Sequence, residues 1–369
     1  MTTVFVVNSG SSSIKWELVD VESAQKLRGG IVERIGEAGR VADHAAAMTA
    51  ILDELGDARP EAIGHRVVHG GSVFRAATLV TDEVERKIDE LSALAPLHNP
   101  ANLAGIRAAR AAFPGVPNVA VFDTAFHQSL APEAYTYAID AQLAAAHGVR
   151  RYGFHGTSYQ YVSTKTAELL GRDDLKLIVF HLGNGASACA IDSGRSVETS
   201  MGMTPLEGLV MGTRSGDLDP GALFHLGRAG LGLPELDTLL NRRSGMLGLS
   251  GRGDMRDVQQ AAEAGDAAAQ AALDVYHHRL RHYLGAYLVL LGSADAIVFT
   301  AGVGENSPVT RAAAVRGLEG FGIRLDEQLN AARGNGARIV SSTGSPVKVL
   351  VVPTNEELEI ARQSAALLG

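Results

Sequence analysis

The sequence predicts an α/β protein built from two related domains, and three observations carry this prediction. The chain has 369 residues, which is too long for one ordinary hydrophobic core. Two strand–turn–strand segments with small polar turns, residues 4–20 and 175–191, each open one half of the chain. Short apolar runs alternate with helical patterns, and several of these runs end at a charged residue. We therefore expect two similar domains that face each other across a cleft, each with one phosphate-binding hairpin.

The first hairpin combines a buried strand with a turn made of small residues. The apolar run 4–7 is followed by the turn 8–13, and residues 14–19 then alternate between apolar and polar, as a paired strand does. Small hydroxyl residues and backbone N–H groups can surround a phosphate closely, and Lys15 would add a positive charge. An ordinary serine-rich hairpin is the alternative interpretation.

The rest of the first half predicts further strands and helices, two of which deliver charged residues into loops. We expect a strand within 27–35, a helix over 43–55, a strand over 62–69, a helix capped by Thr81 that stops at Pro96, a helix to about 112, and a strand over 116–122. Arg66 lies near the end of one strand, and Asp123 directly follows another. In α/β proteins, binding and catalytic residues commonly lie at the carboxyl ends of strands. A surface ion pair is the alternative for each residue.

The second half opens on a histidine in a glycine loop. His155 lies between Gly153 and Gly156, before a helix that Ser158 could cap, and such a residue is better placed to reach a ligand than to pack in a core. A structural histidine is the alternative. The segment 199–220 is long, irregular and rich in glycine, with Arg214 near its centre. Irregular runs of this length tend to be functional, although a surface loop is the alternative.

The last third predicts a long helix, two buried strands and two helix starts. The helix 267–291 has an apolar side that suits a core or a dimer contact. The strand 296–300 leads into a glycine turn, 301–306, where a flat ligand or a phosphate could approach the backbone. Ser307 and Pro308 fit the N-cap and the first position of the helix that follows. After the strand 347–353, Thr354 and Glu357 fit a capping box, which leaves Glu356 to point into a cleft. Alternatively, both acids merely favour the helix dipole.

Composition excludes several classes of protein. The formal net charge of −8 argues against nucleic acid or an anionic membrane as the main partner. The single cysteine, Cys189, cannot form an internal disulfide, and we expect a cytoplasmic protein without a leader or a membrane span. The P-loop, dinucleotide-binding and zinc motifs are all missing from the sequence. What remains is two phosphate hairpins, two loop arginines, a loop histidine and several acids. Enzymes that transfer phosphoryl groups use residues of these kinds.

Nine segments, taken together, make the chain similar to a known family. They are residues 6–15, 64–71, 95–100, 121–127, 152–158, 181–187, 204–217, 299–306 and 353–358. On these segments the chain resembles the acetate kinase family, within the sugar kinase/heat-shock ATPase/actin superfamily. Each short glycine turn alone is weakly specific, but their order along the whole chain is highly specific.

The resemblance implies a duplicated RNase H-like fold with an active-site cleft between two domains. The N-terminal domain would comprise residues 1–123 and 357–369, and the C-terminal domain residues 124–356, with the nucleotide site and the dimer interface. The implied activity is reversible transfer of the ATP γ-phosphoryl group to acetate, with Mg²⁺ (or Mn²⁺) and ADP as product, by a cytoplasmic homodimer. Propionate kinase is the alternative, and an ATP-driven binding switch of the chaperone or actin type is a distant one.

The resemblance also implies roles for single residues. The catalytic residues would be Asp123, His155, Arg214 and Arg66, and Arg66 would bind the carboxylate beside a methyl pocket of Val68, Leu97 and Pro205. The metal would lie near Asn8 and Glu356. The nucleotide would contact Ser11, Ser13, Lys15, His181, Leu182, Gly183, Asn184, Gly185, Asp254, Met255, Arg256, Gly302, Val303, Gly304, Glu305 and Asn306. Acetate is already ionised at neutral pH, so we expect Asp123 to orient Arg66 or hold metal-bound water.

Three departures from the family pattern are visible. Tyr159 stands where many relatives have a histidine, and the chain is somewhat shorter than typical members. Met203 replaces a common phenylalanine near the methyl pocket, which leaves the preferred length of the acid open.

Overall fold

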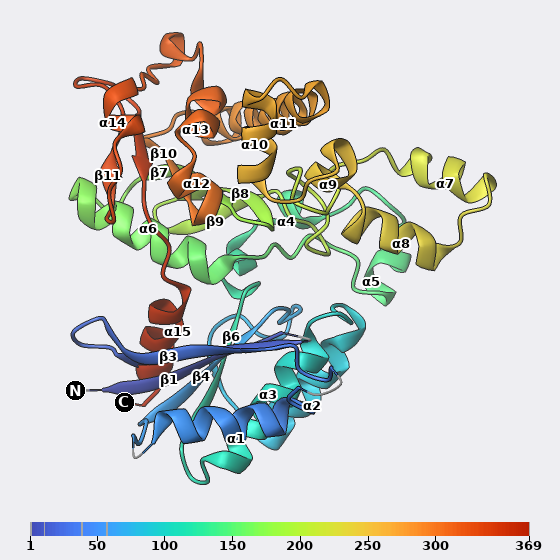
Figure 1. The fold of residues 1–369 in the computed structure, drawn as a ribbon, viewed down its shortest axis with the longest axis vertical. Coiled ribbons are helices and arrows are strands. Elements are labelled where there is room, and N and C mark those ends of the chain that lie inside the picture. The colour runs from blue at the N-terminus through green and yellow to red at the C-terminus, as the bar shows by residue number, and fades with distance from the viewer. Residues whose placement is uncertain (1, 11, 38–39, 57, 369) are drawn as a thin grey trace. The chain divides into compact units, whose positions relative to one another are not determined.

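The computed structural model describes residues 2–10, 12–37, 40–56 and 58–368, which form two compact units (Figure 1). Unit 1 comprises residues 1–128, 154–161 and 355–369, and unit 2 comprises residues 129–153 and 162–354. Each unit is built around one six-stranded sheet. The predicted domain boundaries stay a prediction.

Unit 1 orders its strands β3-β2-β1-β4-β6-β5. Its elements are β1 (Thr3–Ser9), β2 (Ser13–Asp20), β3 (Gln25–Glu33), α1 (His44–Leu55), β4 (Ala62–Val67), β5 (Thr78–Leu79), α2 (Asp82–Glu90), η1 (Leu91–Ala93), α3 (Asn99–Ala112), β6 (Asn118–Phe122) and α15 (Glu356–Ala365). The first three strands are antiparallel, whereas β1, β4 and β6 are parallel to one another. The short 3-10 helix η2 (Ala125–Ser129) follows β6.

The apolar run in β1 is continuous because both faces of the sheet of unit 1 are covered (Figure 1). Phe5 and Val7 pack in one cluster with buried residues of α1 and α3. Val4 and Val6 pack on the opposite face with buried residues of α15. Successive strand residues alternate between faces, so each face receives its own set of apolar side chains. Because β1, β4 and β6 are parallel, their carboxyl ends lie at the same edge of the sheet.

Unit 2 orders its strands β11-β12-β10-β7-β8-β9. Its strands are β7 (Lys176–Leu182), β8 (Ala186–Asp192), β9 (Arg195–Thr199), β10 (Ala296–Thr300), β11 (Arg338–Ile339) and β12 (Lys348–Val351). Its helices are α4 (Pro132–Tyr135), α5 (Ala141–Ala146), α7 (Pro220–Arg228), α8 (Leu233–Arg242), α9 (Gly245–Ser250), α10 (Met255–Glu263), α11 (Ala267–Leu291), α12 (Ala301–Asn306), α13 (Pro308–Val315), η3 (Glu319–Phe321) and α14 (Glu327–Ala331). Helix α6 (Gly156–Leu170) begins in unit 1 and ends in unit 2.

The two sheets share one topology, which confirms the predicted duplicated α/β fold. In each unit a three-stranded antiparallel meander is followed by two strands parallel to its first strand: β4 and β6 beside β1, and β10 and β12 beside β7. A short antiparallel strand closes the far edge of both sheets, β5 in unit 1 and β11 in unit 2. The two predicted hairpins are the first two strands of each meander.

Two predicted helix starts are confirmed. Thr81 caps α2 by accepting the Val84 N–H at 3.3 Å, and Ser307 caps α13, with Pro308 in the first turn. Three other local predictions were wrong, because tertiary partners decide them. Ser158 lies inside α6, which already begins at Gly156. The remaining two are the terminal helix cap and the glycine turn after β10.

The N-cap of α15 is Asn355, whose side chain accepts the Leu358 N–H at 2.9 Å, so the predicted capping box of Thr354 and Glu357 does not form. Segment 301–306 is helix α12 and not a glycine turn. The buried Arg311 guanidinium donates to the carbonyl oxygens of Gly304 at 2.8 Å and Glu305 at 2.9 Å. These contacts satisfy carbonyls that a short helix leaves unpaired at its end.

Within the described part of the chain, no helix combines the length and the apolar character that crossing a bilayer requires.

Candidate active site

Arg66 and Asp123 form a close ion pair at neighbouring strand ends in unit 1. Arg66 lies on β4, and Asp123 directly follows β6, which pairs with β4 in parallel. The Arg66 Nε donates to Asp123 Oδ1 at 3.0 Å and Oδ2 at 3.1 Å, and Nη2 donates to Oδ2 at 2.6 Å. Asp123 is only 2% exposed, so the alternative interpretation as a surface ion pair is wrong. Two parallel donors held by one buried carboxylate fix the plane of the guanidinium.

Two acids of α15 extend this pair into a cluster of charges. Lys15 on β2 donates to the Glu357 carboxylate, and the charge of Glu357 outweighs burial and raises the pKa of Lys15. Burial also opposes the charge of Arg66, but Asp123 and Glu356 together raise its pKa. Burial raises the pKa of Glu356, and the nearby Arg66 charge offsets this only in part. Unit 1 therefore gathers two cations and three acids, of which Glu356 makes no hydrogen bond or ion pair among the residues described.

In the first hairpin turn, one backbone N–H group is already engaged in a hydrogen bond within the turn. The Gly10 N–H donates to the Ser13 carbonyl oxygen at 2.7 Å, so it is not available to a phosphate. Asn8 lies at the end of β1, opposite Lys15 in the register of β1 and β2. Ser11 lies outside the described residues, and the phosphate contacts of Ser13 and Lys15 stay predictions.

His155 adopts a rare backbone conformation next to Asp123. Its φ of 58° lies in the left-handed region, which few residues other than glycine adopt. The following residue, Gly156, donates its N–H to the Asp123 carbonyl oxygen at 2.9 Å. A Cβ at Gly156 would meet that oxygen at 2.3 Å, so only glycine allows this approach. Such an outlier fits a functional role for the partly exposed His155.

Two asparagines that sequence analysis did not single out hold this part of unit 1 together. Asn102 on α3 accepts the Val68 N–H at 3.0 Å and donates to the Ser9 carbonyl oxygen at 2.6 Å. Asn99 exchanges two hydrogen bonds with the backbone of His69, at 3.0 and 3.1 Å. Both asparagines are at least 97% buried, since their exposed fractions are 0% and 3%. The signal in the sequence was two asparagines in the first turn of an otherwise alanine-rich helix.

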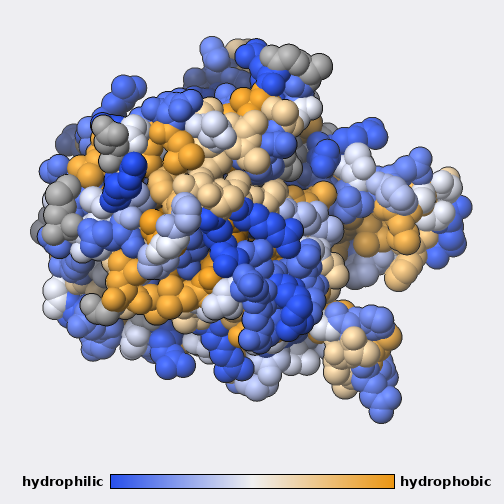
Figure 2. All heavy atoms as spheres, turned by 90° about the horizontal axis from the view of Figure 1, so that it is seen from below, coloured by the Kyte–Doolittle hydropathy of each residue, from blue (hydrophilic) through white to orange (hydrophobic). Residues whose placement is uncertain are grey.

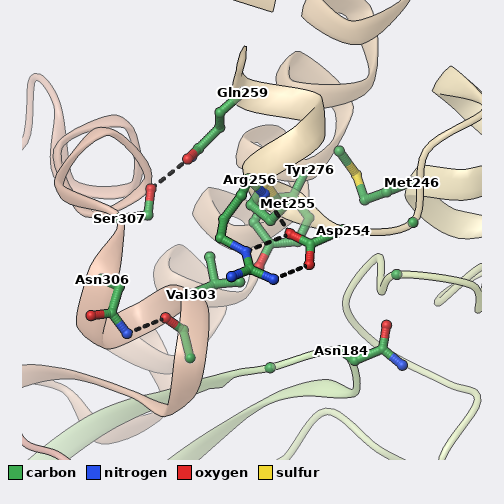
Figure 3. Close-up of a pocket in the computed structure, with 14 residues that line it drawn as sticks. Asn184, Met246, Asp254, Met255, Arg256, Gln259, Tyr276, Val303, Asn306 and Ser307 are labelled. Carbon is green, nitrogen blue, oxygen red and sulfur yellow. Dashed lines mark hydrogen bonds and ion pairs between the residues drawn. The ribbon is translucent and has the colours of Figure 1, made fainter. Parts of the chain in front are cut away.

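Three segments predicted to bind nucleotide meet at one cavity in unit 2 (Figure 3). The cavity has a volume of about 520 Å³. Its walls include eight predicted residues: Gly183, Asn184, Asp254, Met255, Arg256, Gly302, Val303 and Asn306. Five predicted residues of unit 2 do not line it: His181, Leu182, Gly185, Gly304 and Glu305, which lie on β7, in the turn after it and on α12. Of the predicted residues of the first hairpin, Ser13 and Lys15 are not among its walls either.

Asp254 and Arg256 form an ion pair at the start of α10, in the wall of this cavity (Figure 3). Asp254 is the N-cap and accepts the Arg256 N–H at 2.8 Å. The Arg256 guanidinium turns back onto the same carboxylate, with Nε at 3.0 Å and Nη2 at 2.6 Å. These hydrogen bonds lower the pKa of Asp254 to about 2.

Six further residues line the cavity and were not predicted: Gly212, Met246, Gly253, Gln259, Tyr276 and Ser307. Gly212 donates its N–H to the Asn184 carbonyl oxygen at 3.0 Å, and a Cβ there would meet Asn184 Oδ1 at 2.1 Å. The Tyr276 hydroxyl is buried and has no hydrogen-bond partner among the described residues. Gly212 belongs to a segment that the family resemblance already marked, whereas Tyr276 looked like any residue on the apolar side of a long helix.

Arg214 lies on the irregular segment of unit 2 without an acidic partner. Its Nη1 donates to the Pro205 carbonyl oxygen at 3.0 Å, and burial lowers the pKa of its guanidinium. No carboxylate pairs with it in the described part of the chain, so its charge can meet an anionic ligand. Val68 and Leu97 belong to unit 1 and Pro205 to unit 2, and the predicted methyl pocket stays a prediction.

Among the described residues, no three His, Cys, Asp or Glu side chains gather as a protein-only metal cage would. A metal held by one carboxylate, an amide oxygen and substrate phosphates would not need such a cage.

Comparisons with known proteins show the family of the chain. The model of the Acetokinase family matches residues 3–362. An acetate kinase from Leifsonia xyli is 64% identical over 390 residues, covering 99% of this chain and 98% of that protein. The crystal structure of Porphyromonas gingivalis acetate kinase superimposes with a TM-score of 0.96 at 41% identity and covers 100% of both chains. A propionate kinase from Francisella tularensis has a TM-score of 0.95 at 39% identity, covering 99% of this chain and 100% of that chain.

Proposed function

Because this chain belongs to the acetokinase family, we propose that it transfers the γ-phosphoryl group of ATP reversibly to acetate, giving acetyl phosphate and ADP. The observation that carries the proposal is the cavity of unit 2, where segments 183–184, 254–256 and 302–306 meet. Its volume of about 520 Å³ suits a small-molecule ligand such as a nucleoside. Glycine backbones at Gly183, Gly212 and Gly302 allow a flat base or a phosphate to approach closely.

The acceptor carboxylate would bind to Arg66 in unit 1. Asp123 holds the Arg66 guanidinium through three hydrogen bonds, so its second edge can face an anion without losing orientation. Acetate is ionised at neutral pH and needs no base. We therefore assign Asp123 a positioning role and not that of a proton donor.

The chemical step would be an in-line attack of an acetate oxygen on the γ-phosphorus. A new carboxylate O–P bond forms, the bond from phosphorus to the bridging β–γ oxygen breaks, and ADP leaves with that oxygen. Arg66, Arg214 and His155 would stabilise the charge on the equatorial oxygens. Direct transfer predicts inversion at a chiral γ-phosphorus. A route through one phospho-Glu356 intermediate has two successive displacements and predicts retention.

Mg²⁺, or Mn²⁺ in its place, would be held near Asn8 and Glu356. Glu356 fits this role because its partly buried carboxylate makes no hydrogen bond or ion pair among the described residues, and burial raises its pKa. A carboxylate and an amide oxygen are the hard donors that Mg²⁺ prefers. When bound, the ion neutralises charge on the nucleotide phosphates.

We also propose a homodimer in the cytoplasm. Helices α7 and α8 project from the rest of unit 2, and apolar atoms are visible on the projection at the right of Figure 2. Phe224 is 67% exposed and Leu233 83% exposed. On α11, Val289 is 81% exposed. Apolar surface of this kind marks an interaction site, here for a second copy. The single cysteine, Cys189, is buried and needs no oxidising compartment.

The direct test is acetate-dependent ADP formation, with the acyl phosphate trapped by hydroxylamine. The proposal expects trapped product only when acetate, MgATP and the enzyme are all present. Propionate kinase remains the second candidate, because a propionate kinase is among the similar solved structures and one methylene changes binding by only about 1–3 kcal/mol. Slow ATP hydrolysis that ignores acetate would support a binding switch instead.

A further inference from the structure

A second cavity lies within unit 1, and the proposed reaction does not use it. Its volume is about 350 Å³. The walls come from the loop before β5, the end of β6 with the turn after it, the first turn of α6, and α15. Ligand cavities in proteins commonly start at about 300 Å³, so this one is large enough for a small metabolite.

One buried polar side chain of the wall has no hydrogen-bond partner, and a second, an acid, accepts one hydrogen bond. Thr157 is 2% exposed, and its hydroxyl has no hydrogen-bond partner among the described residues. Glu359 is 7% exposed and accepts one hydrogen bond, from Gln363 Nε2 at 2.9 Å. Burial raises the pKa of Glu359, and the hydrogen bond from Gln363 and the charge of Arg362 offset this only in part. Buried polar groups without partners are costly, and a bound ligand can supply what is missing.

The charges of the wall are balanced but not paired with each other. Its two ionisable residues are Arg75 and Glu359. Neither makes an ion pair within the residues that the structure describes. The first turn of α6, which begins at Gly156, adds the partial positive charge of a helix N-terminus on the wall. A ligand that complements one free cation and one free acid carries both a negative and a positive group.

The rest of the wall is mostly apolar and sets the character of the ligand between these groups. The apolar part is formed by Ala76, Ala77, Phe122, Ala125 and Phe126, and the amide side chains of Gln160 and Gln363 also line the cavity. Phe122 stacks on Phe74 with ring centroids 4.3 Å apart, which gives this side of the cavity a rigid surface.

We propose that this cavity binds a free α-amino acid with an apolar side chain. The carboxylate of the ligand binds Arg75 and the N-terminus of α6 with the Thr157 hydroxyl, and its ammonium group binds Glu359. The apolar side chain packs against the alanine and phenylalanine wall. Valine and leucine are the probes that this geometry favours.

The wall of the cavity adjoins two proposed catalytic residues along the chain. Phe122 in the wall directly precedes Asp123, and Gly156 directly follows His155. The hydrogen bond from the Gly156 N–H to the Asp123 carbonyl oxygen joins the two segments.

The test is titration calorimetry of the full chain with L-valine and L-leucine. N-acetyl-L-valine and L-valinamide are matched controls, because the first lacks the ammonium group and the second lacks the carboxylate. We expect each control to bind at least tenfold more weakly than L-valine. The variants Arg75→Gln and Glu359→Gln should each weaken L-valine binding by a similar factor, with a melting temperature and a kcat in the absence of amino acid near those of the parent chain.

Several outcomes would overturn the proposal. They are no binding of either amino acid, binding of both blocked valines as tight as that of L-valine, or undiminished L-valine binding in both variants. Binding of acetate or sulfate as tight as that of L-valine would reduce the site to a simple anion contact. Calorimetry needs no turnover, so a negative result here is independent of the proposed kinase activity.

Discussion

Replacing Asp123 separates a positioning role from a proton-donor role. The carboxylate is 2% exposed and accepts three hydrogen bonds from Arg66. Breaking a buried ion pair by removing one partner costs about 3–5 kcal/mol. At about 1.36 kcal/mol per factor of ten, full expression of this cost in the transition state lowers kcat roughly 10²- to 10⁴-fold in Asp123→Ala. Asp123→Asn keeps one oxygen toward Arg66, so we expect a smaller loss of roughly 10- to 100-fold.

The assay is kcat for acetyl phosphate synthesis as a function of pH, with acyl hydroxamate as the readout. If Asp123 positions Arg66, the pH profile of Asp123→Asn keeps the shape of the parent profile and is only lowered. If Asp123 donates a proton, the parent shows a limb that disappears in Asp123→Asn, and the Asn and Ala variants are equally impaired. That second pattern would refute the positioning role. Thermal melting of both variants serves as the control for folding.

Three further predictions concern Arg214, Asn102 and Glu356. Arg214→Ala should lower kcat by roughly 10³-fold, by analogy with arginine fingers, while KM for acetate changes much less; a near-normal kcat would remove Arg214 from the site. Asn102→Ala leaves one buried N–H and one buried carbonyl unpaired and should lower the free energy of unfolding by about 2–6 kcal/mol in urea titrations. Asn335 is exposed, so Asn335→Ala serves as the control. An equal loss of unfolding free energy in the two variants would contradict the stabilising role of the Asn102 hydrogen bonds. Glu356→Gln should abolish Mg²⁺-dependent turnover yet raise the melting temperature without ligand. Burial raises the folded pKa of Glu356, so its ionisation favours the unfolded chain as pH rises. The increase in melting temperature of Glu356→Gln over the parent chain should therefore be larger at pH 8 than at pH 5.

Features set by short-range pattern were predictable from the sequence. The apolar run 4–7, the small-residue turn and the alternation in residues 14–19 predict a hairpin, and β1 and β2 pair as its strands. Arg66 and Asp123 follow neighbouring strands, and the parallel order of β4 and β6 brings them together. The long helix 267–291 has the bounds that its composition suggested.

Features decided by distant neighbours were not predictable in this way. The glycines of 301–306 indicated a turn, but Arg311 binds the carbonyl oxygens at the end of this segment and completes a helix. Thr354 fits a cap by sequence, yet Asn355 supplies it. Asn102 donates to a backbone oxygen 93 residues away, and no local sequence pattern predicts such a long-range hydrogen bond.

The central claim is that this chain phosphorylates a short carboxylate, with acetate preferred. The most direct measurement is kcat/KM for acetate, propionate and butyrate with MgATP, with the acyl phosphate trapped by hydroxylamine. We predict the highest kcat/KM for acetate and a decline with each added methylene. Equal or better use of propionate would contradict the preference for acetate, and failure to form any acyl phosphate would contradict the kinase activity itself.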